Sequence, residues 1–148
     1  MRGGVVFLWF VVFLLAFCQS REEKYLQEVE KIMQGARQKL NDLLKKARTA
    51  KSKEEVIEIL RQYGESVKKT AQEYRELANR YPELTENKKK IEEKFHQTYQ
   101  ALRQGLGELQ ERIKKWQKEF QRERDFQNAL EEAIRASREA EESTRPEI

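Results

Sequence analysis

The sequence predicts an all-α protein: an antiparallel helical hairpin followed by one long C-terminal helix, together a three-helix, coiled-coil-like bundle preceded by an N-terminal signal helix. Charged residues make up 38% of the 148 residues, whereas Gly and Pro occupy only 6 and 2 positions, a composition that favours helices over β structure. Apolar residues repeat at alternating spacings of three and four, the period of a helical seam. The length allows one domain.

The first 18 residues form a separate segment that we interpret as an export signal. Arg2 is followed by an unbroken apolar run from Val5 to Cys18. Fourteen residues are short for a membrane span, which needs about 20, and are typical of the apolar region of a secretory signal. We therefore expect residues 19–148 to lie outside the cytoplasm.

Cys18 ends the apolar run and is the only cysteine, so no intramolecular disulfide can form. The tetrapeptide Leu15–Cys18 resembles a bacterial lipobox, although Phe17 stands where lipoproteins usually have a small residue. This resemblance implies that Cys18 is the lipid attachment site, and Gln19 beside it is similar to the residue found in outer-membrane lipoproteins. Two alternatives remain: cleavage after Cys18 or Ser20 with release of the chain, and an uncleaved single-pass anchor.

Two helices, at about 22–50 and 53–80, should form the hairpin. The first carries the seam Leu26, Val29, Met33, Ala36, Leu40, Leu43 and Ala47, and the second carries Val56, Leu60, Tyr63, Val67, Thr70, Tyr74, Leu77 and Tyr81. Ser52 and Glu55 have the spacing of a capping box, which predicts that the second helix begins there. Because the connection is short, the two helices should be antiparallel neighbours.

Pro82 should end the hairpin, and Thr85 should be the N-cap of a third helix over residues 86–141. The pair Gly105 and Gly107 allows two interpretations. A break there would produce a fourth helix that folds back to give a four-helix bundle. We expect a continuous helix, because the apolar repeat crosses the glycines without a Pro, Asn or Ser. With residues 142–148 as a flexible tail, the helical bundle should span 19–141.

A continuous third helix would extend beyond the hairpin and leave its distal apolar residues exposed. Such a surface marks an interaction site, because large apolar patches on soluble proteins usually bind a partner. We expect self-association or binding of another helical envelope protein through Leu109, Ile113, Trp116, Phe120, Phe126, Leu130 and Ile134.

Catalytic motifs are not found in the sequence, so we expect no enzyme activity, no cofactor and no small-molecule substrate. His96 is the only histidine and has no metal-ligand spacing around it. The basic clusters Lys88–Lys90 and Lys114–Lys118 have acidic neighbours, and the 30 basic and 26 acidic side chains nearly balance. Together with export, this balance argues against a nucleic-acid partner.

The sequence therefore predicts an exported, lipid-anchored, all-helical protein of the cell envelope with a structural or protein-interaction role. The expected location is the outer membrane or periplasm, with secretion or a single-pass anchor as alternatives. A periplasmic holdase-type chaperone is the alternative function. The chain is similar in size, signal and basic character to the tentacled helical outer-membrane chaperones, but it lacks their β-strand trimerisation segments.

Overall fold

The protein is all-helical, as predicted. The computed structural model describes the backbone of residues 3–85 and 88–144 and the side chains of 21–85 and 89–144, and this part of the chain contains no strand. Its elements are a short 3-10 helix, η1 (Pro82–Leu84), and five α-helices: α1 (Gly3–Thr49), α2 (Lys53–Arg80), α3 (Lys88–Lys94), α4 (His96–Glu119) and α5 (Arg124–Ser143).

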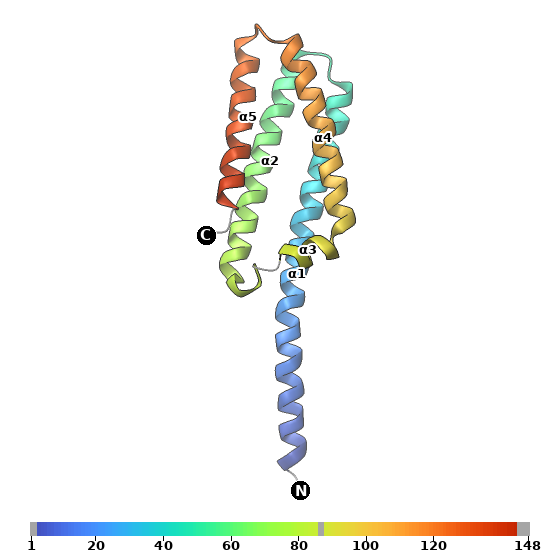
Figure 1. Cartoon of the computed structure of the whole chain (residues 1–148), viewed down its shortest axis with the longest axis vertical. Helices are drawn as coiled ribbons and strands as arrows, with labels where there is room; N and C mark the ends of the chain where they lie inside the picture. Colours follow the sequence, from blue (N-terminus) through green and yellow to red (C-terminus); the bar gives the residue numbers. More distant parts are fainter. Residues whose placement is uncertain (1–2, 86–87, 145–148) are drawn as a thin grey trace.

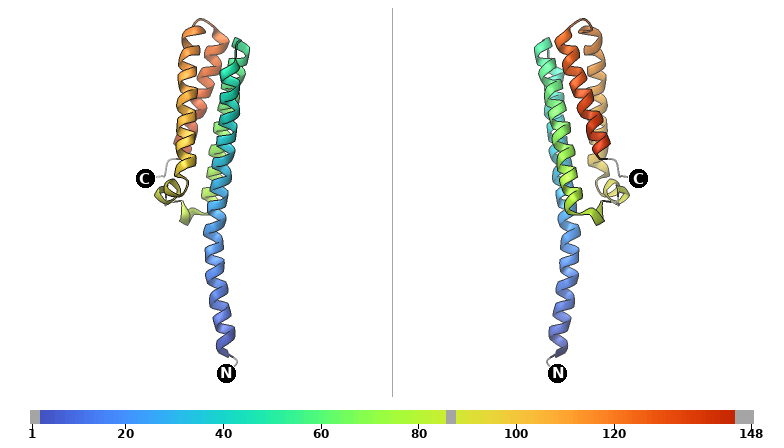
Figure 2. Two further views of the ribbon diagram at one scale, coloured as in Figure 1. Left: turned by 90° about the vertical axis from the view of Figure 1, so that its right-hand side faces the viewer. Right: turned by 90° about the vertical axis from the view of Figure 1, so that its left-hand side faces the viewer.

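The four long helices lie side by side in two layers. α2 runs antiparallel to α1, α4 packs against α1, and α5 packs against α2. Figure 2 shows α4 and α5 on one side of the molecule and α1 and α2 on the other. The N-terminal part of α1 extends well beyond the end of this bundle, away from the α4–α5 turn (Figure 1).

The hairpin between α1 and α2 has the predicted capping box. The Ser52 hydroxyl accepts a hydrogen bond from the Glu55 backbone N–H at 3.2 Å, and the Glu55 carboxylate accepts from the Ser52 N–H at 3.2 Å. α1 begins far earlier than the predicted residue 22, because nothing between Cys18 and Glu22 interrupts a helix. The predicted signal segment and the first bundle helix are therefore one continuous helix from Gly3.

The predicted end of α2 at Tyr81 is correct. The Tyr81 N–H donates to the Leu77 carbonyl, and η1 then begins at Pro82. The Thr85 hydroxyl donates to the Pro82 carbonyl at 2.9 Å, which closes η1; the predicted capping contact with residues 86–87 lies outside the described residues. Phe95, with φ −108° and ψ 26°, interrupts the helix between α3 and α4.

The prediction of one continuous helix over 86–141 is wrong. α4 does continue through Gly105 and Gly107, but it ends at Glu119, and α5 begins at Arg124 and folds back along α2. A straight helix would leave Phe126 and Leu130 in water, whereas the turn buries both. Burying a large apolar side chain stabilises a fold by about 1.5–3 kcal/mol, which outweighs the few backbone hydrogen bonds lost at the turn. The alternative of a fold-back placed the break at the glycines, about 15 residues too early in the chain.

Two apolar clusters fill the bundle. The larger one lies between the four long helices and contains Leu40, Leu43, Leu44, Ala47, Val56, Ile59, Leu60, Leu109, Trp116, Phe126 and Leu130. The smaller one lies at the end near η1 and α3 and is built on Tyr25, Val29, Met33 and Leu77, with Ile91 and Phe95 packed against it. α3 therefore covers the end of the core that α5 does not reach.

The tightest helix pair is α2 with α5, and small residues make it possible. A Cβ added at Gly64 would lie 3.6 Å from the Ala133 Cα and 3.7 Å from the Ala136 Cβ. Ala129, Ala133, Ala136 and Ala140 repeat at spacings of four and three along the α2-facing side of α5. Small side chains let two helix backbones approach closely, so this alanine stripe positions α5 on α2.

Candidate interaction surface

The seven residues predicted to form a docking surface lie mainly inside the bundle. Leu109, Trp116, Phe126 and Leu130 are buried, and Ile113 and Phe120 are partly buried against the same core cluster. Ile134 alone among the seven is exposed, at 42% of its surface. These apolar residues therefore pack within one chain, because α5 supplies the partner face that we expected another molecule to provide. The seven residues therefore do not form a contiguous exposed docking surface.

Three charged residues and two rings hold the α4–α5 turn. Lys53 at the start of α2 reaches Glu123 at 3.1 Å and Asp125 at 3.0 Å. The hydrogen bond from Lys53 lowers the pKa of Asp125, and the same bond raises the pKa of Lys53. The Phe120 and Phe126 rings contact each other across the turn, tilted by 48° with centroids 5.5 Å apart. These contacts place the start of α5 beside the start of α2.

The opposite end of the bundle has an aromatic corner where η1 meets α1. The Tyr25 and Tyr81 rings meet edge-on at 5.5 Å, and the Arg21 guanidinium lies 5.0 Å above the Tyr81 ring. Arg21 also donates to the Glu83 carboxylate at 2.7 Å and to the Arg80 carbonyl at 3.1 Å, and the first bond lowers the pKa of Glu83. Arg21 is thus fixed to the bundle directly after the apolar run.

Tyr74 is the most strongly perturbed titratable group of the described residues. Burial, with smaller contributions from the nearby hydroxyls of Tyr25 and Tyr99, raises the pKa of its hydroxyl to about 12. Desolvation disfavours the charged phenolate, so the ring stays neutral at physiological pH. No catalytic partner accompanies it, and we interpret Tyr74 as a structural residue between α2 and α4.

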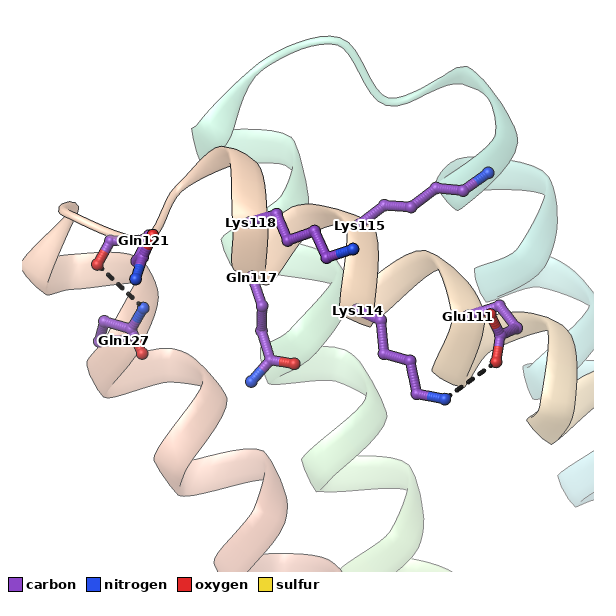
Figure 3. Close-up of a pocket in the computed structure, with 7 residues that line it drawn as sticks. All are labelled: Glu111, Lys114, Lys115, Gln117, Lys118, Gln121 and Gln127. Carbon is purple, nitrogen blue, oxygen red and sulfur yellow. Dashed lines mark hydrogen bonds and ion pairs between the residues drawn. The ribbon is translucent and has the colours of Figure 1, made fainter.

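A basic groove lies at the distal end of the bundle, beside the α4–α5 turn. It has a volume of about 580 Å³ and is lined by Glu111, Lys114, Lys115, Gln117, Lys118, Gln121 and Gln127. Figure 3 shows that these side chains come from the last turns of α4, from the connection and from the start of α5. The Lys114 ammonium contacts Glu111 at 3.0 Å, and the Gln127 amide donates to the Gln121 carbonyl. The predicted basic cluster Lys114–Lys118 contributes three lysines to this groove.

A second groove, of about 370 Å³, runs along α1 and α2 on the other side of the bundle. Its lining mixes acidic, basic and small residues, including Gly35, Lys39, Asp42, Glu65 and Lys69. A Cβ at Gly35 would meet nothing within 4 Å. The mixed charge of this groove favours no single class of ligand.

No chemistry-bearing cluster accompanies these surfaces. Within residues 21–85 and 89–144, no group of three His, Cys, Asp or Glu side chains is placed to hold a metal ion. His96 is exposed at the start of α4. No helix in the described part of the chain combines the length and apolar character that a membrane span needs. The predicted lipid attachment at Cys18, and the side chains of the apolar run, lie outside the described residues.

The alanine stripe of α5 is the signal that sequence reasoning missed. Four alanines at a helical spacing predict a close helix contact, and they lie within the segment that we assigned to an extended rod. Comparison of the chain with family models, curated proteins and solved structures found no match in any of the three.

Proposed function

We propose that this chain is an exported, lipid-anchored, all-helical protein of the cell envelope, whose bundle has a structural or protein-interaction role. One observation carries the proposal: the apolar run Val5–Cys18 ends in a cysteine directly before the bundle begins. An apolar run of this length with a terminal cysteine is typical of a lipoprotein signal. The proposal includes no catalysis and no cofactor.

The connection between tether and bundle supports a structural role. Arg21, the third residue after Cys18, is bonded to Glu83 and to the Arg80 carbonyl. Three residues correspond to about 4.5 Å along a helix. A lipid on Cys18 would therefore hold the bundle close to the membrane surface, without a flexible linker.

The surfaces of the bundle favour protein contact over capture of unfolded chains. A holdase needs many exposed aromatic side chains, but Trp116, Phe126 and Tyr25 are buried, and Tyr99 is the one aromatic residue among the exposed large hydrophobic residues of the described structure. The groove beside the α4–α5 turn is lined by lysine, glutamine and glutamate residues and by no apolar residue. We therefore propose a folded, charged partner surface and set the chaperone aside.

The mass of the mature N-terminus tests the lipid anchor. We expect the native protein to begin at an acylated Cys18 and to fractionate with membranes, because two or more acyl chains give stable anchoring. Cys18→Ser should abolish acylation, whereas Ser20→Ala, two residues away, should leave it intact. A mature chain beginning at Gln19 or Arg21, or one retaining Met1, would contradict the lipid anchor and identify release or a single-pass anchor instead.

A further inference from the structure

The outer face of the α4–α5 layer points away from α1 and α2 (Figure 2). α4 packs on α1 and α5 packs on α2, and the two helices meet mainly at their turn. The two large apolar residues exposed in the described structure lie one on each helix: Tyr99 on α4, at 41%, and Ile134 on α5, at 42%. Ile134 lies on the helical face of Gln127, which lines the basic groove, whereas Tyr99 lies near Tyr74 of α2.

The exposed ridge of α4 is basic. It points away from the buried Leu109 and Trp116 and carries the exposed Arg103, Gln110, Lys114 and Lys118, with the half-buried Gly107 among them. Its acidic neighbour Glu111 is exposed and paired with Lys114. Such an exposed pair contributes little stability and can exchange for another carboxylate.

Two carboxylates on the outer ridge of α5 lie at the heights of two basic residues of α4. The ridge consists of the half-buried Gln127 and the exposed Glu131, Ile134, Arg138 and Glu142. Heights along α4 are counted from its last residue, Glu119, and along α5 from its first, Arg124, at about 1.5 Å per residue. Lys114 and Glu131 then lie at about 8 and 11 Å from the turn. Arg103 and Glu142 lie at about 24 and 27 Å. Arg138 lies level with Gly105 and Leu106 of α4, which carry no charge.

We propose that this face binds a second copy of the same chain as a parallel, two-fold dimer in which α4 of each copy lies over α5 of the other. A two-fold axis along the bundle brings Lys114 opposite Glu131 and Arg103 opposite Glu142, so that each contact occurs twice. The parallel orientation rests on the proposed tether, because copies anchored at the same end in one membrane point the same way. The basic groove then receives the acidic side of the partner copy's α5.

Gly107 supports a close approach on this face. A Cβ at Gly105 would lie 2.7 Å from the Leu40 Cδ2, so contact with α1 explains that glycine. A Cβ at Gly107 would meet nothing within 4 Å, so packing within one chain does not require it. A glycine on the α4 ridge, between Arg103 and Lys114, leaves space for the second helix.

The proposed contact is polar and weak, and confinement of both copies to one membrane makes it strong enough for dimer formation. Charged and amide side chains dominate both ridges, so the interface resembles a weak, transient contact rather than an obligate one. Tethering two copies to one membrane raises their effective concentration and strengthens a weak contact without new interactions. The opposite charges at equal heights select the partner face and set the register between the two copies.

Charge reversal and rescue test the dimer in the full chain, expressed and kept in its native membranes. Dimer is measured as the yield of a disulfide between Gln110→Cys and Ile134→Cys introduced on separate, differently tagged copies. Lys114→Glu should lower this yield at least about fivefold through like-charge repulsion with Glu131, and Lys114→Glu with Glu131→Lys should restore it. Lys39→Glu, on the opposite α1–α2 side, should leave the yield unchanged.

Gly107→Ala gives a second, independent readout, with Gly35→Ala as its matched control. Both glycines lie in open helical positions, so both variants should fold with undiminished helix content. Only Gly107→Ala should lower the disulfide yield. The dimer is overturned if the charge swap fails to restore the yield, or if Gly107→Ala leaves it unchanged.

The outcome can be separated from that of the lipid anchor. The N-terminal mass reports the anchor whatever the disulfide yield. A released chain that still cross-links in solution with the same charge rescue keeps the dimer and loses the tether. An acylated Cys18 without cross-linking keeps the tether and overturns the dimer.

Discussion

Two glycines on the same helix have different physical roles. Gly105 lies against Leu40 and Leu44 of α1, where an added Cβ would come within 2.7 Å of the Leu40 side chain. Leu40 is itself buried, so it has little room to move. Gly35 and Gly107 have no such neighbour. Of Gly35, Gly105 and Gly107, only Gly105 has a packing contact that offsets the cost of glycine in a helix.

We expect Gly105→Ala to lower the free energy of unfolding by about 1–3 kcal/mol, because overpacking outweighs the gain in helix propensity. Gly35→Ala, with the same chemistry in open space, should raise it by about 0.5–1 kcal/mol. Urea unfolding followed by circular dichroism measures both. Equal effects of the two substitutions would contradict the α1–α4 contact.

Tyr74 makes stability depend on alkaline pH. Its folded pKa of about 12 lies above the ordinary value of 10, so the protonated hydroxyl favours the folded state. This contribution is complete below pH 10 and is lost as the pH rises from 10 to 12, by about 2–3 kcal/mol in total. Tyr74→Phe should reduce the loss of stability over that interval, measured by urea unfolding at stepped pH. Tyr81→Phe, a ring at the η1 corner that is not among the groups that perturb Tyr74, is the control and should retain the loss.

At the scale of elements, α5 is positioned by its alanines more than by its charges. The Glu123 and Asp125 partners of Lys53 are about half exposed, and ion pairs in contact with solvent contribute little stability. Gly64 with Ala133 and Ala136 defines how closely α5 approaches α2. A large side chain in that stripe must push the helices apart and reopen the core around Phe126.

Ala133→Leu should therefore lower the free energy of unfolding by about 2–4 kcal/mol, because the buried stripe has no room for three more carbons. Glu132→Leu, at the neighbouring exposed position, should change it by less than about 0.5 kcal/mol. Thermal or urea unfolding distinguishes them. A harmless Ala133→Leu would mean that α5 does not pack on α2.

At the scale of the whole molecule, the chain is a four-helix bundle on a helical extension rather than a three-helix bundle with a projecting rod (Figure 1). The fold-back uses one apolar seam to complete the core of the same chain. What remains outside is a charged face, so association between copies should depend on salt and on matching charges.

Spin labels report this arrangement directly. Labels at Glu65→Cys on α2 and Glu132→Cys on α5, in a Cys18→Ser background, should lie within about 20 Å, since packed helices are 8–10 Å apart and each label adds its own length. A continuous C-terminal helix would separate them by about 40 Å at 1.5 Å per residue. A distance of about 40 Å in pulsed electron paramagnetic resonance would therefore support a continuous C-terminal helix and contradict the fold-back.

Several features set by neighbouring residues could be predicted from the sequence alone. Helical content follows from composition, the start of α2 from Ser52 and Glu55, and its end from Pro82, because capping and proline geometry act within four residues. Continuity through Gly105 and Gly107 was also readable, since the apolar repeat does not change there.

The end of the last helix and the contacts of its apolar seam depend on tertiary packing. Residues Gln121–Glu123 contain no glycine, proline or capping side chain that would announce a turn. The chain turns there because Phe126, Leu130 and the alanine stripe find a partner face on α2 in the same molecule. That gain comes from contacts distant in sequence, so local propensity cannot reveal whether an apolar seam meets its own chain or another copy.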